Sequence, residues 1–404
     1  MFCNKLFLIL TLTFLSFYGC TPEIWEKIEG YIPYANLEIR YGFVNENGEW
    51  VIEPVYQSGR DFSNGFAFVH NKGKGFYINE RNEILGKVNF DSGEDFGPFG
   101  ALVSEAGYAG YITSGGAYII KPKFVRAYPI VNGFALVNEY GGSEYSYINL
   151  NSLETIINFS YIGDINLNFT SGDSSLLPYF CEEGKWGFIN EVGELKLPCE
   201  YDAVRNFSEG KAGVAKTQNS GELLWTYIDT TGKTTGSYDY SSVSDYKYGL
   251  TSVMKMKNNT ETYLLLDDKG YKVSNKEYVA QPEIGSEYTF VMENWDEGYY
   301  IGPNKKIVKA SGKQITQGCP FQNGKFLIRT EGSTDSDGQY WLSESGGIAS
   351  FIIDTNKIPK GGMVHTIGCP SANGLIIVGV SYQPKLFDRN TFPLPSFSFL
   401  KEVF

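Results

Sequence analysis

Residues 184–214 read GKWGFINEVGELKLPCEYDAVRNFSEGKAGV, and this stretch decides the fold. The run to Pro198 predicts two strands joined by a tight turn, because Gly193 supplies the positive φ that such turns favour. Pro198 cannot donate to a strand ladder, so it is typical of a strand end. A second turn at residues 207–210 precedes Lys211, after which residues alternate as in a third strand. The unit is therefore predicted to hold three antiparallel strands.

Two patterns of this unit recur along the chain at matching periods. The first is a large apolar residue, an aliphatic residue and often Asn or Asp, at intervals of 34 to 41 residues, beginning at Phe43, Tyr77, Tyr111, Tyr147, Phe188, Tyr227, Leu265, Tyr300 and Trp341. The second is a Gly that opens an apolar strand, at Gly65, Gly100, Gly133, Gly172, Gly210, Gly249, Gly285, Gly324 and Gly374. One unit alone cannot bury its apolar face, so neighbouring units must cover it. We predict an all-β fold, a tandem array of about ten three-stranded antiparallel repeats of roughly 33–50 residues each.

Three of these units resemble the WG-repeat family. The resemblance is carried by WGFIN at residues 186–190 with FSEGKAGV at 207–214, by YGFVN at 41–45 with FSNGFAFV at 62–69, and by GYI at 110–112 with GFALV at 133–137. The other units keep only the two recurring patterns. Over roughly residues 30–395, the resemblance implies an all-β repeat array used for binding or scaffolding, and it implies no known catalysis.

The two ends of the array are complementary in phase. Residues 30–32 (GYI) match the Gly-led strand, and residues 386–388 (LFD) match the first pattern, so the chain ends with two strands of a further unit. A strand from the start can complete that unit, as in propellers that close their ring. Ragged ends with a capping segment at residues 396–404 are the alternative. The sequence leaves a propeller-like ring and an open β-superhelix equally open.

The amino terminus predicts export and a lipid anchor. Lys5 precedes an apolar run over residues 6–17, and Gly19-Cys20 follows, which resembles a bacterial lipobox. We expect a signal peptide at 1–19, a tether at 20–28 lipidated on Cys20, and the repeat array at 29–404. Acyl chains would hold the protein to a membrane. The expected location is the bacterial cell envelope, at the outer membrane, with the periplasmic or surface face left open.

Composition narrows the classes of partner. Charged residues make up 20% and aromatics 16% of the 404 residues, which is typical of a foldable chain rich in β structure. The formal net charge is −12, and no basic cluster is present. An acidic chain binds polyanions poorly, so we expect no nucleic-acid partner.

Cysteine placement predicts one disulfide. Cys319 and Cys369 occupy the same place in adjacent repeats, before Gly324 and Gly374. Equivalent positions in adjacent units lie side by side, so a bond between them is feasible in an oxidising envelope. Two free buried thiols are the alternative. A Cys181–Cys199 bond is a weaker prediction, and the spacing is poor for a zinc site built from Cys alone.

One segment matches part of a calcium-loop motif. Residues 333–338 (STDSDG) followed by Glu344 have EF-hand spacing, with Asp335, Asp337 and Glu344 as ligands. Ser333 replaces the first Asp, and the segment falls in the strand register of repeat nine. We therefore expect a polar turn and no metal or cofactor, with calcium as the weaker interpretation.

Catalytic constellations are sparse in the sequence. The chain has two His, His70 and His365, and neither belongs to a nucleophile motif. Carboxylates in turns are explained by turn propensity, so a glycosidase-like pair is a weak hypothesis. Trp50, Trp225 and Trp295 lie outside the first pattern and are candidates for stacking on sugars.

We therefore predict a non-enzymatic, lipid-anchored protein whose repeat surface binds a protein or envelope component. A glycan or small-ligand binder is the alternative, and a hydrolase is a weaker one. Exposed Trp and Tyr gathered in a groove would favour the second hypothesis, and two carboxyl groups facing each other across a cleft would favour the third.

Overall fold

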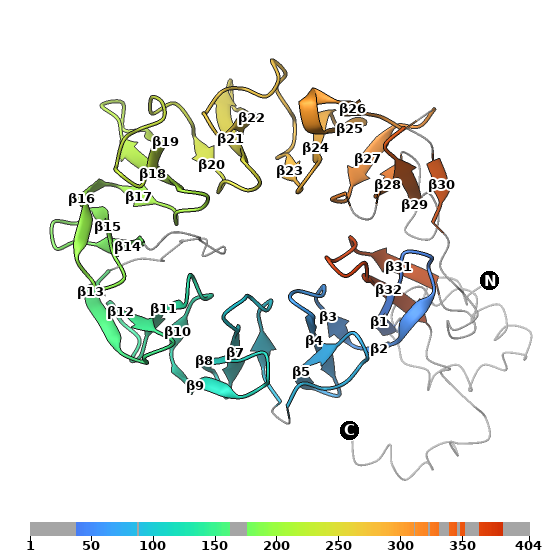
Figure 1. Cartoon of the computed structure of the whole chain (residues 1–404), viewed down its shortest axis with the longest axis horizontal. Coiled ribbons are helices and arrows are strands. Elements are labelled where there is room, and N and C mark those ends of the chain that lie inside the picture. Colours follow the sequence, from blue (N-terminus) through green and yellow to red (C-terminus); the bar gives the residue numbers. More distant parts are fainter. Residues whose placement is uncertain are drawn as a thin grey trace, which may run out of the picture. The chain divides into compact units, whose positions relative to one another are not determined.

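The computed structural model describes residues 38–86, 89–161, 176–310, 312–321, 324–330, 339–345, 348–351 and 363–382. The chain divides into two units: Met1–Glu38 with Lys360–Gly362 and Ser381–Phe404, and Ile39–Pro359 with Met363–Val380. The second unit holds the repeat array, and its described elements are strands apart from one 3-10 turn at Pro303–Lys305 (Figure 1). Within the described ranges, no helix has the length and apolarity needed to cross a membrane.

The strands form small antiparallel sheets, numbered here one to nine. Sheet one is β31 (Met363–Ile367), β32 (Ile376–Tyr382), β1 (Glu38–Val44) and β2 (Trp50–Tyr56). Sheet two is β3 (Ser58–Gly59), β4 (Phe66–Asn71) and β5 (Lys74–Asn79); sheet three is β6 (Ser92–Gly93), β7 (Ala101–Glu105), β8 (Tyr108–Ile112) and β9 (Tyr118–Phe124); sheet four is β10 (Arg126–Ala127), β11 (Phe134–Asn138), β12 (Glu144–Asn149) and β13 (Thr155–Ser160).

The remaining sheets follow the same plan. Sheet five is β14 (Leu177–Phe180), β15 (Trp186–Ile189) and β16 (Leu195–Tyr201); sheet six is β17 (Ala203–Val204), β18 (Lys211–Thr217) and β19 (Leu223–Asp229); sheet seven is β20 (Ser242–Val243), β21 (Leu250–Lys257) and β22 (Thr260–Asp267). Sheet eight is β23 (Glu283–Ile284), β24 (Thr289–Asn294), β25 (Glu297–Ile301) and β26 (Ile307–Val308); sheet nine is β27 (Ile315–Gly318), β28 (Lys325–Thr330), β29 (Gln339–Ser343) and β30 (Ile348–Ser350). One residue pair, Gly298–Ile315, joins the last two sheets.

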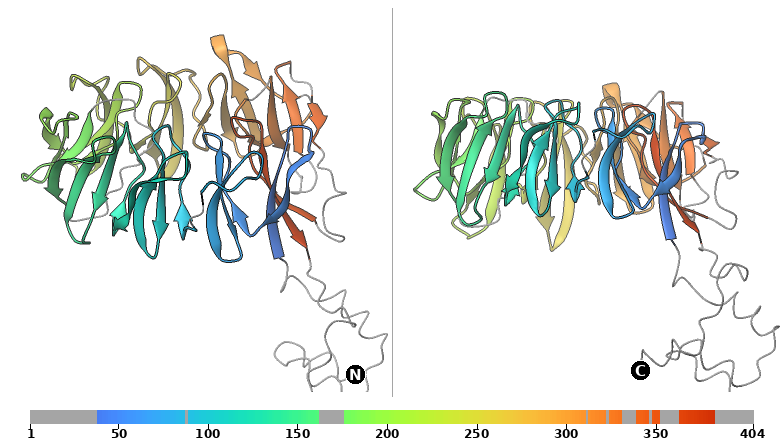
Figure 2. Two further views of the ribbon diagram at one scale, coloured as in Figure 1. Left: turned by 60° about the horizontal axis from the view of Figure 1, so that its bottom comes forward. Right: turned by 90° about the horizontal axis from the view of Figure 1, so that it is seen from below.

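The structure confirms the all-β array, but the strands of one sheet do not all come from one sequence repeat. The Gly-led strand does not pair with the two longer strands before it in the sequence repeat, and the short β17 is its one partner from that repeat among the described strands. Instead, β18 pairs with the following β19 from Lys211–Asp229 to Thr217–Leu223. The connection between β18 and β19 is short, which favours a hairpin over a longer-range pairing. Each sheet therefore straddles two sequence repeats, and Figure 2 shows these sheets standing side by side.

The Asn or Asp of the first pattern builds the turn that follows its strand. The Oδ1 atom of Asn190 accepts hydrogen bonds from the backbone N–H groups of Val192 (3.2 Å) and Glu194 (2.8 Å). Asp229 and Asp267 make the same pair of bonds. A short polar side chain that binds backbone N–H groups two and four residues later stabilises a turn locally. The sequence pattern thus records turn chemistry and not a ligand site.

Four of the five tyrosines that begin the first pattern bond a backbone carbonyl of the next sheet or of the residues beside it. The buried hydroxyl of Tyr111 in sheet three donates to the Tyr128 carbonyl beside sheet four, at 2.7 Å. Equivalent bonds run from Tyr77 to the Glu94 carbonyl, from Tyr227 to the Ser244 carbonyl and from Tyr300 to the Cys319 carbonyl. The hydroxyl of Tyr147 is buried and has no hydrogen-bond partner among the described residues.

The apolar core runs as a closed circuit through the second unit. Each pair of neighbouring sheets shares a cluster of buried side chains, in the order one–two, two–three, three–four, four–five–six, six–seven, seven–eight, eight–nine and nine–one. The last cluster joins Leu327 of sheet nine to Val44 and Ile376 of sheet one. Because the described clusters link each sheet to the next and the ninth sheet back to the first, this unit is a propeller-like fold and not an open superhelix.

The closing sheet draws strands from both ends of the second unit. Its order is β2-β1-β32-β31, so the early strand β1 pairs with the late strand β32 (Figure 1). The indole N–H of Trp341 in sheet nine donates to the Glu46 carbonyl of sheet one, at 3.0 Å. The predicted half-units at residues 30–32 and 386–388 lie outside the described residues, as do the signal peptide, the tether and Cys20. Closure by strand exchange was one of the two predicted outcomes, although it uses strands further inside the chain.

Candidate functional site

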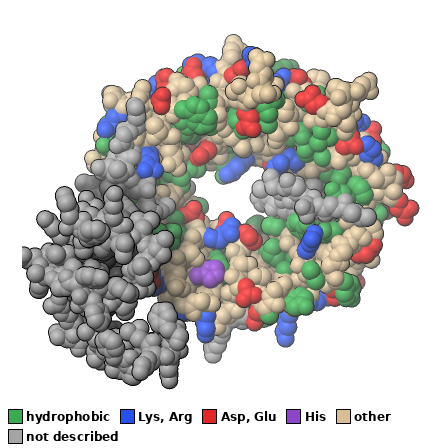
Figure 3. Space-filling model, turned by 180° about the vertical axis from the view of Figure 1, so that it is seen from behind, with side chains coloured by type: hydrophobic (Ala, Val, Ile, Leu, Met, Phe, Trp, Pro, Cys, Tyr) green, Lys and Arg blue, Asp and Glu red, His purple; other side chains and the backbone are tan. Residues whose placement is uncertain are grey.

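The candidate binding surfaces are grooves between neighbouring sheets. Two grooves flank the contact between sheets three and four, with volumes of about 270 Å³ and 490 Å³. A third, of about 510 Å³, lies where residues of sheets seven, eight and nine meet. Over the face in Figure 3, apolar and charged side chains are interspersed and no single charge dominates the described part. The grooves, not a charged field, are therefore the distinctive features of the surface.

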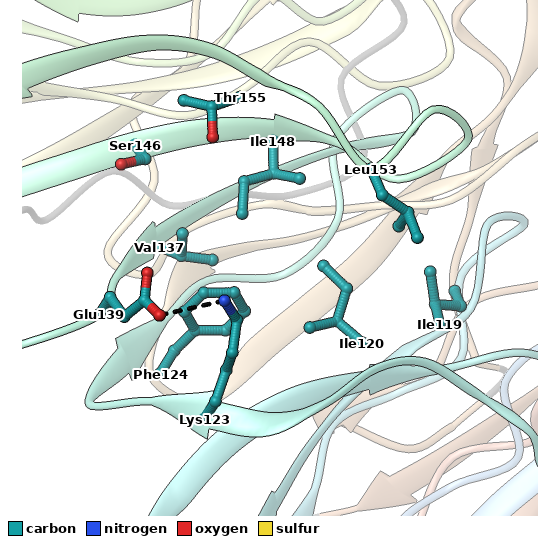
Figure 4. Close-up of a pocket in the computed structure, with 10 residues that line it drawn as sticks. All are labelled: Ile119, Ile120, Lys123, Phe124, Val137, Glu139, Ser146, Ile148, Leu153 and Thr155. Atoms are coloured by element: carbon teal, nitrogen blue, oxygen red, sulfur yellow. Dashed lines mark hydrogen bonds and ion pairs between the residues drawn. The ribbon is translucent and has the colours of Figure 1, made fainter.

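The smallest groove is apolar with a charged end. Ile119 and Ile120 of β9 face Ile148 and Leu153 across it (Figure 4). At the other end the ammonium of Lys123 lies 3.1 Å from the carboxylate of Glu139. Both charged side chains are largely exposed, so this ion pair contributes little stability. The groove offers a slot for apolar groups and no reactive chemistry.

The second groove, named groove A, is lined by a mixture of apolar, aromatic, polar and charged side chains. Its walls come from β6, β7, β8 and β10, and from residues 125–128. Tyr108 and Tyr128 are its aromatic residues, and Tyr108 is 49% exposed. The Asp91 carboxylate on the rim accepts a hydrogen bond from the Gly107 backbone N–H, at 3.1 Å. Aromatic and polar groups together make this groove suited to binding.

The other charged groups of groove A are already engaged. The Glu94 carboxylate lies 2.9 Å from the Arg60 guanidinium, which also holds Asp95 at 2.7 Å. The Arg126 guanidinium reaches the Tyr145 hydroxyl at 3.4 Å. Of the two carboxylates in groove A, Glu94 therefore has an ion pair, whereas the described residues show for Asp91 only the hydrogen bond from Gly107.

The third groove brings two carboxyl groups to one surface. Asp245 is held by the Arg205 guanidinium at 2.7 Å, and both side chains are mostly buried. Glu283 lines the same groove, and partial removal from water raises the pKa of its carboxyl group. The groove also holds a hydrogen bond from the Gln281 amide to the Ser244 hydroxyl, at 3.0 Å. Because Asp245 is neutralised by Arg205, it is poorly placed to act as a base or nucleophile.

His70 takes part in a local hydrogen-bond network. Its Nδ1 lies 3.1 Å from the Ser58 hydroxyl, and its Nε2 lies 3.1 Å from the Asp91 backbone carbonyl. The third member of this arrangement is a carbonyl and not a carboxylate, so it lacks the charge that stabilises an imidazolium in a catalytic triad. The network joins sheets two and three. The side chain of His365 is not among those described.

Both pairs of cysteines are close in the structure. The sulfur atoms of Cys319 and Cys369 face each other between sheets nine and one, with Cα atoms 5.4 Å apart, which suits a disulfide. The sulfur atoms of Cys181 and Cys199 face each other within sheet five, with Cα atoms 6.2 Å apart. A Glu183 carboxylate oxygen and the two sulfur atoms of this second pair lie within 4.8 Å of one another. The chemical state of the four thiols stays a prediction that thiol titration tests.

The calcium candidate is described only at Glu344. Its carboxylate accepts hydrogen bonds from the Tyr288 hydroxyl (2.8 Å) and the Lys306 ammonium (2.9 Å). The bond from Lys306 is the main cause of the lowered pKa of this carboxyl group. Asp335 and Asp337 lie outside the described residues. The described partners of Glu344 thus serve the contact between sheets eight and nine.

The predicted aromatic candidates do not gather in one place. Trp50 is buried, Trp225 is half-buried against sheet seven, and Trp295 is exposed on the turn between β24 and β25. None of the three lines a described groove. Tyr108, Asp91 and the rest of groove A were not predicted from the sequence. A usable signal was present, since Ala109 of repeat three stands where repeat five has Trp186.

Comparison with known proteins agrees with the repeat pattern. Residues 41–74, 110–142 and 186–218 match the family model for the WG containing repeat, and these are the three units with the fullest motifs. A comparison with curated proteins finds no match. The structure is similar to the eukaryotic initiation factor, with 10% identity, 78% of this chain and 97% of that chain covered, and a TM-score of 0.50. It is also similar to BamB from Moraxella catarrhalis, with 9% identity, 84% and 98% covered, and a TM-score of 0.37. At such identities, only the fold is shared.

Proposed function

We propose that this chain is a non-enzymatic, lipid-anchored cell-envelope protein whose repeat surface binds a protein or another envelope component. The observation that carries the proposal is groove A, an open recess lined in part by apolar and aromatic side chains between packed sheets. Rigid scaffolds with grooves between elements are where binding sites concentrate. The WG-type units and the propeller-like fold support an interaction scaffold.

A binding role suits the chemistry of the grooves better than a reaction. The side chains that a hydrolase would need are held by structural partners: Asp245 by Arg205, Glu94 by Arg60, and His70 by Ser58. Neutralised carboxylates and a histidine without a carboxylate partner make weak general bases. We therefore favour a scaffold over an enzyme.

The envelope location rests on the amino terminus. The charged, apolar and Gly-Cys segments of residues 1–20 resemble a lipoprotein signal. Acylation of Cys20 would attach the repeat array to the outer membrane through the tether at residues 20–28. The net charge of −12 supports a partner other than nucleic acid.

The anchor is tested by Cys20→Ser in the full chain, with Cys3→Ser as the matched control from the same segment. We expect Cys20→Ser to move the protein from the membrane fraction to the soluble fraction, and Cys3→Ser to leave it at the membrane. Membrane retention of Cys20→Ser would refute the anchor. The released protein, immobilised and incubated with envelope extract, should retain a partner that free protein displaces; no displaceable partner would count against the scaffold.

Glycan binding is the second candidate, favoured by Tyr108 and Tyr128 in groove A. Sugar rings stack on aromatic faces while carboxylate and guanidinium groups bind their hydroxyls. Calorimetric titration with soluble envelope oligosaccharides tests it, and saturable heat that Tyr108→Ala removes would support it.

A further inference from the structure

Groove A exists because repeat three lacks an aromatic ring that other repeats have. Strand pairing sets the equivalence: Tyr41 pairs with Tyr56, Ala109 with Phe124, and Trp186 with Tyr201. A glycine follows Tyr41, Ala109 and Trp186, and each of these glycines is equally crowded. A Cβ on Gly42, Gly110 or Gly187 would lie 2.5, 2.6 or 2.7 Å, respectively, from a backbone oxygen of the paired strand. Ala109 therefore occupies the position of Tyr41 and Trp186 on the same backbone frame.

The side chain of Ala109 faces sheet four. Ala109 pairs with Ser104, and Tyr111 pairs with Leu102, so these four residues lie on one face of sheet three. The Tyr111 hydroxyl on that face reaches the Tyr128 carbonyl beside sheet four. Ser104, Ala109 and the facing Ala127 all line groove A. Three small side chains meet there, and the space between them is open.

The equivalent space is filled at seven other described positions, and the remaining one carries Gln339. Tyr41, Tyr145, Trp186, Trp225 and Tyr263 each place a ring in or against the core cluster at their position. Where glycine replaces the ring, at Gly75 and Gly298, a Cβ would collide with the rings of Phe68 and Phe290, which occupy the space instead. The recess in sheet three thus corresponds to a space that an aromatic side chain occupies in other repeats.

We propose that groove A receives an aromatic side chain, flanked by Lys or Arg, from an extended segment of a partner polypeptide. The inference rests on the proposed scaffold function and names its partner chemistry. Leu102, Val125 and Ala127 supply apolar walls, and Tyr108 and Tyr128 supply rings at the rim. Aromatic anchors seated in such pockets dominate many protein interfaces.

Electrostatic attraction should favour a cationic residue next to the aromatic side chain of the partner. The Asp91 carboxylate at the rim is exposed and bonds only to the Gly107 N–H among the described residues. The chain as a whole carries a net charge of −12. A cationic neighbour of the anchor would therefore be attracted, and an acidic neighbour would be repelled.

The test fills the recess with the ring that the repeat lacks. Ala109→Trp should keep the fold, because Trp186 and Trp225 occupy the same position in repeats five and six, and Ala109→Tyr is a second variant that copies Tyr41 and Tyr145. The probe is acetyl-Gly-Trp-Lys-Gly-amide, with its Trp→Ala and Lys→Glu versions as controls. Binding is measured by chemical-shift titration of the full chain carrying Cys20→Ser.

We expect wild-type protein to bind the Trp-Lys probe and to discriminate against both control peptides. Ala109→Trp and Ala109→Tyr should each weaken binding of the probe at least tenfold. Asp91→Asn should reduce the preference for the Lys peptide over the Glu peptide several-fold. Tyr140→Ala, which removes an exposed ring outside the groove, should leave binding unchanged. Equal binding by wild type and both filled variants would overturn the inference, as would chitooligosaccharide binding in place of the peptide. If the filled variants still retain the displaceable envelope partner, this inference fails while the scaffold function stands.

Discussion

Tyr111 and Tyr147 belong to the same sequence pattern, but we predict opposite effects on stability when their hydroxyl groups are removed. Tyr111 and Tyr147 are both buried tyrosines at the start of the first pattern, one repeat apart. The Tyr111 hydroxyl donates to the Tyr128 carbonyl at 2.7 Å, whereas the Tyr147 hydroxyl has no partner among the described residues. Replacement by Phe removes one oxygen from each and leaves the ring in place.

The expected magnitudes follow from that difference. Tyr111→Phe removes a buried hydrogen bond and leaves a carbonyl without its donor, which should lower the free energy of unfolding by about 1–2 kcal/mol. Tyr147→Phe removes a buried hydroxyl that has no hydrogen-bond partner among the described residues, so it should be neutral or stabilise by up to about 1 kcal/mol. The two variants should therefore differ from each other by about 1–3 kcal/mol.

The assay combines urea unfolding with native-state hydrogen exchange of the amides in sheets three, four and five. Exchange is needed because repeat arrays open locally and a single unfolding midpoint averages over them. Tyr111→Phe should speed exchange in sheets three and four, and Tyr147→Phe should not speed it in sheets four and five. Equal destabilisation by both variants would refute the reasoning, because it would mean that ring packing and not the hydroxyl bond sets the cost.

Two further predictions concern the closing contact and the third groove. The double variant Cys319→Ser, Cys369→Ser should lose about 2–4 kcal/mol of stability under oxidising conditions. A reducing agent should lower the stability of the wild type toward that of the variant. Unchanged stability, together with free thiols at both cysteines of the wild type, would rule the bond out. Partial removal from water raises the pKa of the Glu283 carboxyl above its unfolded value, so its ionisation opposes folding. Stability should therefore fall as pH rises from the ordinary glutamate range through the folded pKa, by a small amount because the residue is still exposed to solvent. Glu283→Gln should abolish that loss and be more stable than wild type at neutral pH, and pH-dependent unfolding curves that superimpose for the two proteins would contradict it.

The sequence alone determined the strands and turns of this protein, because their causes are local. Asn190, Asp229 and Asp267 stabilise their own turns through backbone N–H groups two and four residues away, and the Gly-led strands begin at two-residue turns such as Asn64-Gly65, where both φ angles are positive (49° and 85°). Such turn chemistry recurs with the repeat, so periodicity in the letters reports it directly.

Tertiary structure decided what depends on contacts between repeats. Hairpin formation sets which strand joins which sheet, so the sheets straddle the sequence units, and pairing of β1 with β32 closes the array. The partner of Tyr111, the lone hydroxyl of Tyr147 and the recess at Ala109 all depend on a neighbouring sheet that periodicity does not place. In the sequence, Ala109 indicates only that repeat three has lost an aromatic residue of the motif. The structure adds that Ala109 lies beside Ala127 and Tyr128 and that these residues leave a groove, because a missing ring leaves space when no neighbouring side chain moves in to fill it.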